Sequence, residues 1–323
     1  MSIKKVLLSY DYELYFNECF CDEYESLIKP TDLIIDAYLE RGVRCTFFVD
    51  TECILKYKEI GKNDVVMAIE NQLARMVKNG FDVQLHIHPL WESAEYCNGH
   101  FSFDYDRYDL KRFSLNEISV FIERGKNYLD ALLKNVNPLY ECIAFRAGGF
   151  CLPNNELFAT TLFNKGFLID SSIAPNTILD SKYQSFDYCG RKSILKSDNI
   201  KEVPILTAKR LNLFYLLNHK KAPLKAVLRG KGSPVLFNSP KICRLFNSIR
   251  ENALITLDNH NYIFIKNCLL RNRDDIVSIL GHPKLEDETI IKNTSDLISS
   301  TNELFDYLTF AQFAETNCDK KDI

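Results

Sequence analysis

Two histidines stand two residues apart in the segment Asp82-Val-Gln-Leu-His-Ile-His-Pro, near the end of a predicted strand. Side chains alternate between the two faces of a strand, so Gln84, His86 and His88 share one face and the apolar residues share the other. Two imidazoles placed in this way can reach the same metal ion. A pair of hydrogen-bonded core histidines is the alternative, but their position on a polar strand face favours a metal site.

A pair of carboxylates follows the first predicted strand. Asp11 and Glu13 come directly after the apolar run Lys5-Val-Leu-Leu-Ser-Tyr10, and alternation puts both on the same side. One of them could bind a metal ion while the other acts as a general base. Two carboxylates that cap a helix would have the same pattern, so this signal is weak by itself.

Other polar residues and a glycine pair also stand where predicted strands end. Arg146 follows Glu141-Cys-Ile-Ala-Phe, Asp170 follows Phe-Leu-Ile, and His282 follows Ile-Val-Ser-Ile-Leu-Gly. Each could be a turn or ion-pair residue. Together they are typical of the C-terminal rim of a parallel barrel, where barrel active sites lie. The pair Gly148-Gly149 would allow the backbone to approach a ligand closely.

The elements that must position these residues alternate along the chain. Runs of β-branched and aromatic residues predict strands, while i, i+4, i+7 and i+8 apolar spacing and terminal glycines predict helices. This alternation indicates an α/β fold with parallel strands. The predicted strands are 5–10, 43–49, 81–88, 141–145, 167–170, 254–257, 262–265 and 276–280; the predicted helices are 32–41 with Thr31 as N-cap, 63–80 with Asn63 as cap, 115–134 and 154–165.

Composition excludes several classes of protein. The chain has 323 residues, of which 46% are hydrophobic, and a formal net charge of -3, which excludes collagen and low-complexity disorder and gives no attraction to nucleic acid. Eleven scattered cysteines without a Cys-x-x-Cys pair indicate reduced thiols. The apolar run at 6–8 is too short for a signal peptide, and no run approaches a membrane span. We therefore expect a cytoplasmic protein.

Residues 207–250 form a basic segment, with ten Lys or Arg and no Asp or Glu. We interpret it as an insertion in the barrel. It could be a solvated helical excursion, the slightly favoured alternative. It could also bind an anionic partner, such as a sugar phosphate, a pyrophosphate carrier or the inner face of a membrane. It contains no nucleic-acid-binding motif.

In their order along the chain, these residues resemble the motifs of the polysaccharide deacetylases, the NodB-homology family or carbohydrate esterase family four. The closest match is the lipopolysaccharide-biosynthesis branch. The matching segments are Ser9–Tyr12 for Thr-Phe-Asp-Asp, Thr46–Val49 for Thr-Phe-Phe-Val, Gln84–Trp91 for the histidine motif, Arg146 in Phe-Arg-Ala-Gly-Gly-Phe, Asp170–Ser172 for Asp-Ser-Ser, and Leu280-Gly-His282 for Leu-x-His. The resemblance implies one distorted (β/α)7–8 barrel over residues 1–316, with 307–315 as the final strand and helix and 317–323 as a C-terminal tail.

The resemblance also implies a hydrolase of carbon–nitrogen bonds other than peptide bonds. It would remove an N-acetyl group from a sugar during lipopolysaccharide or capsule biosynthesis, with a divalent metal, zinc favoured, polarising the carbonyl. The metal would be held by His86, His88 and one carboxylate. Asp11 would be the base, oriented and kept charged by Arg146, and His282 would protonate the leaving amine.

The same resemblance suggests residues that contact the substrate. Tyr12 and Trp91 would either stack on the sugar or simply pack within the protein. Leu280 would line the acetyl pocket, and Gly148 and Asp170 would lie beside the substrate. From the expected cytoplasmic location, the N-acetylated sugar would be attached to a nucleotide or lipid carrier.

Two departures from the family pattern leave alternatives open. The second aspartate of the first motif is Tyr12, and the usual His-x-x-x-His has become His86-x-His88. Glu13 could replace the missing ligand, or Asp11 could bind the metal while Glu13 acts as base. The departures also allow a different reaction or an inactive site.

Three other functions compete with this hypothesis. An amidohydrolase would need further ligands, for which His100, His219 and His260 are available. A retaining glycosidase could use the two carboxylates without a metal. A carbohydrate- or carrier-binding barrel without activity would use the basic segment. Retention of two histidines, an arginine and a rim histidine together favours the active enzyme.

Overall fold

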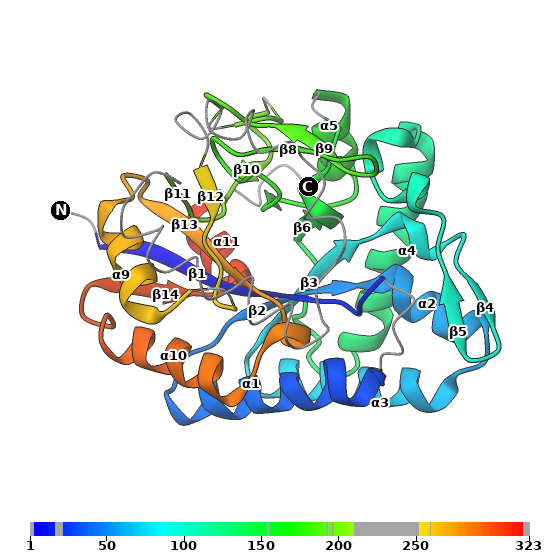
Figure 1. Cartoon of the computed structure of the whole chain (residues 1–323), viewed down its shortest axis with the longest axis horizontal. Helices are drawn as coiled ribbons and strands as arrows, with labels where there is room; N and C mark the ends of the chain where they lie inside the picture. Colours follow the sequence, from blue (N-terminus) through cyan, green and yellow to red (C-terminus); the bar gives the residue numbers. More distant parts are fainter. Residues whose placement is uncertain are drawn as a thin grey trace.

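Eight parallel strands form the central sheet (Figure 1). The computed structural model describes residues 3–16, 22–153, 156–191, 193–195, 197–209, 252–258 and 260–318. The sheet order is β10-β7-β6-β3-β2-β1-β13, and β14 pairs with the first half of β1. The strands are β1 (Lys4–Tyr12), β2 (Thr46–Asp50), β3 (Asp82–Ile87), β6 (Ala144–Ala147), β7 (Ile169–Asp170), β10 (Lys201–Glu202), β13 (Ile276–Gly281) and β14 (Phe305–Leu308).

The sheet curls until its two ends meet. Beyond β10, Ile205 forms a parallel bridge with Ser278 of β13, and the backbone N–H of Leu206 donates to the carbonyl of Ser278 at 2.8 Å. The same segment donates to β7, where the N–H of Val203 lies 2.8 Å from the carbonyl of Asp170. These contacts confirm the predicted distorted (β/α) barrel.

Helices cover the outside of the sheet, with α1, α3 and α10 along one side (Figure 1). The α-helices are α1 (Lys29–Glu40), α2 (Thr51–Glu59), α3 (Asn63–Lys78), α4 (Leu115–Leu133), α5 (Glu156–Asn164), α9 (Tyr262–Arg271), α10 (Glu288–Ser299) and α11 (Phe310–Asn317). A π-helical turn, η1 (Tyr24–Ile28), precedes α1. The 3-10 turns are η2 (Pro89–Trp91), η3 (Tyr105–Arg107), η4 (Leu110–Arg112), η5 (Gly148–Phe150) and η7 (Pro283–Leu285). Three antiparallel strand pairs lie outside the central sheet: β4 (Glu95–Cys97) with β5 (His100–Ser102), β8 (Ile178–Asp180) with β9 (Ser185–Asp187), and β11 (Thr207–Lys209) with β12 (Asn252–Leu254).

Most predicted elements lie where expected, including the closing strand and helix, β14 and α11. The strand predicted at 262–265 is wrong, because Asn261 caps a helix there by accepting from the N–H of Phe264 at 2.9 Å. The strand predicted at 254–257 is reduced to the end of β12 and one bridge from Thr256 to Leu280. Helix α2 was not predicted.

Two predicted helix caps are also wrong. Thr31 lies inside α1, and its hydroxyl donates to the carbonyl of Leu27 at 2.6 Å, one turn earlier. The preceding π-helical turn therefore extends the helical segment beyond the predicted start. Asn63 is the first residue of α3, and the flanking position is Lys62, which forms no side-chain cap.

Strand alternation decides which side chains of β1 enter the barrel. Val6, Leu8 and Tyr10 pack into the large core formed with the outer helices, whereas Leu7 belongs to a second cluster with α11. In that second cluster Phe310 of α11 meets Phe48 edge-on, with ring centroids 4.9 Å apart. Apolar residues thus fill part of the barrel interior, and polar side chains gather towards the C-terminal ends of the strands.

No helix among the described residues is long and apolar enough to cross a membrane. Most of the basic segment 207–250 and most of the tail 317–323 lie outside the described residues, as does His219. The domain limits and the anionic partner predicted for that segment stay predictions.

Candidate metal centre

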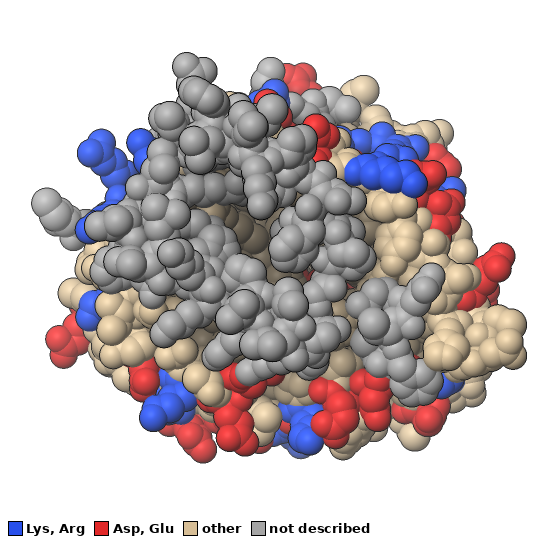
Figure 2. All heavy atoms as spheres, in the orientation of Figure 1, with Lys and Arg blue, Asp and Glu red and all other residues tan. Residues whose placement is uncertain are grey.

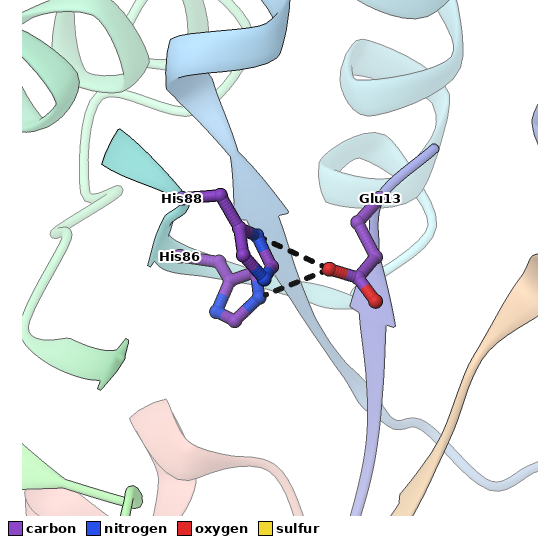
Figure 3. A group of neighbouring side chains, drawn as sticks. All are labelled: Glu13, His86 and His88. Atoms are coloured by element: carbon purple, nitrogen blue, oxygen red, sulfur yellow. Dashed lines mark ion pairs between the residues drawn. The ribbon is translucent and has the colours of Figure 1, made fainter. Parts of the chain in front are cut away.

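Three ligand-type side chains meet at the C-terminal ends of β1 and β3 (Figure 3). One atom each from Glu13, His86 and His88 lies within 4.8 Å of the others, and all three residues are buried. Oε2 of Glu13 is 3.1 Å from Nδ1 of His88 and 3.5 Å from Nε2 of His86. The two parallel strands, joined through β2, bring together residues more than seventy positions apart.

The donor atoms of this group fit a divalent metal ion. Oε2 of Glu13, Nε2 of His86 and Nδ1 of His88 are buried, and none has a hydrogen-bond partner. A buried polar atom without a partner costs about 1–3 kcal/mol, so three that converge on one point need an explanation. Two imidazole nitrogens and one carboxylate oxygen match the donor set of a catalytic zinc site with a position left for water.

The strand next to β3 orients His86. Its second ring nitrogen, Nδ1, lies 2.8 Å from the backbone carbonyl of Arg146 on β6, which fixes the ring and directs Nε2 towards Glu13. Burial alone would lower the pKa of His86, but Asp11 and Glu13 outweigh it and raise that pKa. The ring of His86 is therefore fixed by a backbone carbonyl at Nδ1, and its Nε2 faces the carboxylates of Asp11 and Glu13.

Gly148 lies against His88, directly after β6. A Cβ atom at this position would collide with the ring of His88 and would lie 2.6 Å from the carbonyl oxygen of Ile87. The glycine therefore makes room for His88, and its predicted place beside the substrate stays a prediction.

Glu13 is fixed by Lys284, which was not among the predicted site residues. Nζ of Lys284 lies 2.8 Å from Oε1 of Glu13, and Nε2 of His282 is 3.7 Å from the same oxygen. Burial would raise the pKa of Glu13, but the positive charge of Lys284, with contributions from the three histidines, holds that pKa well below its usual range. Oε1 is therefore engaged, and Oε2 is left facing His86 and His88.

Asp11 has a separate partner. Its Oδ1 accepts from Nη1 of Arg146 at 2.6 Å, and its Oδ2 lies 4.0 Å from Nε2 of His86. Both Asp11 and Arg146 are buried. Asp11 thus lies at the edge of the metal centre without belonging to the group of three.

The guanidinium of Arg146 is held from three parts of the barrel. Nη2 lies 3.0 Å from Oγ of Ser9 and of Ser171 and 3.2 Å from Oγ of Ser278, and Nε donates to the carbonyl of Ser171 at 2.9 Å. The serines were not predicted. Alternation could have identified Ser9, which stands two residues before Asp11 on the inner face of β1.

His282 also has an unpredicted partner. Its Nδ1 lies 3.1 Å from Oδ2 of Asp258, and its Nε2 faces Glu13. Burial would lower the pKa of His282, but the Asp258 carboxylate outweighs that effect and raises it. Asp258 follows the apolar run 254–257, which is the same signal that identified the other residues at strand ends.

Of the two alternatives for Tyr12 and Trp91, the structure favours packing within the protein over stacking on a sugar. Tyr12 points to the outer face of β1, is 2% exposed, and donates to Oε1 of Gln72 at 2.8 Å. Strand alternation explains this orientation, since Tyr12 lies between Asp11 and Glu13. Trp91 is 1% exposed and donates from Nε1 to Oδ2 of Asp50 at 2.8 Å.

Asp170, predicted to lie beside the substrate, is hydrogen-bonded to Ser172, and its contact with substrate stays a prediction. It is fully buried and accepts from the backbone N–H of Ser172 at 3.0 Å and from its hydroxyl at 2.7 Å. Burial, with repulsion from Glu202, raises the pKa of Asp170 to about 7. Leu280 is buried on the face of β13 that also carries Ser278, so it does point into the barrel.

The amidohydrolase alternative needed further histidine ligands. Of these, the structure describes His100 and His260, and neither lies in the metal centre. His100 is exposed on β5, and His260 lies after β12; neither belongs to the group of donor atoms. The glycosidase alternative gives no role to the imidazoles of His86 and His88, which lie in the centre.

Comparisons with known proteins support the fold. No sequence-family profile and no curated protein matches the chain. A protein from Mycobacterium smegmatis, assigned as a polysaccharide deacetylase, superimposes with a TM-score of 0.53 at 13% identity, covering 97% of this chain and 90% of that one. The peptidoglycan deacetylase PdaC from Bacillus subtilis superimposes with a TM-score of 0.42 at 14% identity, covering 97% of this chain and 91% of that one. BA3943 from Bacillus anthracis, a pseudoenzyme of carbohydrate esterase family four, superimposes with a TM-score of 0.45 at 9% identity, covering 96% of this chain and 64% of that one. The first shows a shared fold; the other TM-scores are below 0.5 and support no argument.

Proposed function

We propose that this protein is a metal-dependent hydrolase that removes the N-acetyl group from a sugar. The observation that carries the proposal is the convergence of three buried, unpartnered donor atoms of Glu13, His86 and His88. These residues would hold one divalent ion, with zinc the favoured metal because it accepts two imidazoles, a carboxylate and a water. An ion held there supplies a Lewis acid for an acetamide carbonyl and lowers the pKa of water towards ~7.

The side chains around the centre divide the proton transfers between them. Asp11 accepts the proton of the attacking water, and the bond from Arg146 at 2.6 Å keeps its carboxylate in one orientation. His282 donates a proton to the departing amine, because its Nε2 faces the centre while Asp258 holds its Nδ1. The base and the acid thus come from the C-terminal ends of two adjacent parallel strands, β1 and β13.

The proposal also specifies the class of substrate. Resemblance to the lipopolysaccharide-biosynthesis branch supports an N-acetylated sugar on a nucleotide or lipid carrier as substrate, in the biosynthesis of a surface polysaccharide. The fold is shared with the M. smegmatis protein and is compatible with this chemistry. The reaction would be hydrolysis of a carbon–nitrogen bond that is not a peptide bond.

Metal content tests the proposal first. Untagged protein analysed by mass spectrometry should carry about one equivalent of zinc or a similar ion, and His86→Ala should lose it. His100→Ala is the matched control, because His100 is exposed and lies outside the group. Acetate release from nucleotide-linked N-acetylhexosamines, abolished in His86→Ala, would then support the reaction.

Two results would contradict the proposal. Native protein without metal, even after reconstitution, would overturn the mechanism. A metal-loaded protein that binds N-acetylated sugars without releasing acetate would instead support the inactive carbohydrate-binding barrel.

A further inference from the structure

Asp50 occupies a helix N-cap position but does not cap its helix. It is the last residue of β2 and directly precedes α2, with an extended backbone conformation. An aspartate in this position usually accepts a hydrogen bond from the second or third N–H of its own helix. Its side chain makes no such bond with α2. The carboxylate therefore serves another part of the molecule.

Both oxygens of Asp50 are directed to the segment that follows β3. Oδ1 accepts from the backbone N–H of His88 at 3.2 Å, and Oδ2 accepts from Nε1 of Trp91 at 2.8 Å. Oδ2 also lies 3.3 Å from Nδ1 of His88, the atom that faces Glu13. The side chain of Asp50 is fully buried, so these contacts are not weakened by water.

The strand register explains how this carboxylate reaches His88. Asp50 pairs with His86 in the β2–β3 ladder, and His88 follows directly after the end of β3, two residues beyond that pair. After His88 the chain turns through η2, where Pro89 offers no N–H. Asp50 thus anchors the turn at both its start and its end, through His88 and Trp91.

The position and the charge of Asp50 both favour metal binding at His88. Fixing the His88 backbone keeps its ring aimed at the donor group, and a buried negative charge beside Nδ1 favours a cation bound to that atom. Asp50 is not itself part of the group of atoms within 4.8 Å. Its influence on a bound ion is therefore exerted through His88.

We propose that Asp50 is a positioning residue that orients His88 and, through it, sets the affinity of the centre for a divalent ion. The inference rests on the proposed function, because it assigns a supporting residue to the same metal site. Partners of metal ligands typically change metal affinity 10- to 100-fold when they are removed, so we expect an effect of about that size.

The experiment compares zinc affinity in three proteins: wild type, Asp50→Asn and Trp91→Phe. Each untagged apoprotein is titrated with Zn²⁺ against a chromophoric chelator, and its thermal unfolding is recorded without metal. Asp50→Asn removes the charge with little change of shape and should raise the Kd about 10- to 100-fold. Trp91→Phe removes the other hydrogen bond of Asp50 and should lower the Tm while the Kd stays within about threefold. Asp50→Ser, with a smaller side chain, gives the same test through its own Kd if the asparagine variant does not fold.

The outcomes separate this inference from the proposed function. A wild-type Kd that is unchanged in the folded Asp50 variants would overturn the inference and leave the metal site in place. Equal losses of affinity in Asp50→Asn and Trp91→Phe would also overturn it, because they would indicate a general loss of structure. Wild-type protein that binds no zinc would remove the proposed function and the inference with it.

Discussion

Arg146 donates from Nη1 to Oδ1 of Asp11 at 2.6 Å, while Glu13, two residues further along the chain, places Oε2 3.1 Å from Nδ1 of His88. Two carboxylates on the same side of one strand therefore have different partners. Asp11 is paired with a fixed cation at the edge of the centre, and Glu13 faces the two imidazoles. This difference in partners favours Glu13 as the metal ligand and Asp11 as the base.

Exchanging each carboxylate for its amide tests that division. Glu13→Gln should lose the bound metal, because an amide is a much poorer ligand than a carboxylate. Asp11→Asn should keep about one equivalent of metal and lose activity by about 10²- to 10⁴-fold, the usual contribution of a general base. Metal analysis and acetate release on the same preparations measure both effects. The reverse pattern would exchange the two roles.

Removal of Arg146 should leave a charged carboxylate buried without its partner. Arg146→Met is expected to lower the free energy of unfolding by about 3–5 kcal/mol, as for other broken buried ion pairs. The double variant Arg146→Met/Asp11→Asn should be less destabilised than the sum of the single variants. Urea unfolding of all three measures this coupling.

Lys29→Met is the control for that series, because Lys29 forms an exposed ion pair with Glu25 and its loss should change stability little. Strict additivity of the Arg146 and Asp11 changes would contradict the prediction.

Asp258 should affect catalysis only through His282. His282→Gln is expected to lower kcat by about 10²- to 10⁴-fold, and Asp258→Asn should lower it as well, because the ring loses the partner of its Nδ1. Both variants should retain the metal. The double variant should be hardly slower than His282→Gln alone, since the two residues act as a unit. Loss of metal in Asp258→Asn, or fully additive losses in kcat, would argue against this role.

The raised pKa of Asp170 predicts a pH-dependent stability. Its pKa is about 7 in the folded protein against 3.8 for an exposed aspartate, so the folded state binds more protons between these values. Stability from this group is therefore greatest below pH ~4 and is lost as the pH rises towards 7. Asp170→Asn should lack this dependence, so its stability relative to wild type should improve by about 3 kcal/mol from pH 5 to pH 8.

Urea unfolding of the metal-free proteins at both pH values checks this prediction. A stability difference between wild type and Asp170→Asn that does not change with pH would show that the carboxyl group is not protonated when the protein folds.

The sequence by itself determined the features that depend on neighbours along the chain. Alternation on β1 and β3 predicted that Asp11 and Glu13 share one face and that His86 and His88 share another. It also determined that Tyr12 points away from the site, although the family motif had suggested otherwise. Strand ends next to polar residues identified Arg146 and His282. The short apolar run at 262–265 was ambiguous, because such a run fits a strand or a buried helix equally well.

Only the tertiary structure decided which of these residues touch. The order and register of the strands bring Arg146 to Asp11 and Lys284 to Glu13 across 135 and 271 positions of sequence. The same packing buries Trp91 on Asp50 and pairs His282 with Asp258. Local periodicity arises from the geometry of one strand and is therefore visible in sequence. Contacts across the barrel depend on how all the strands curl and pack together, and no local pattern contains that information.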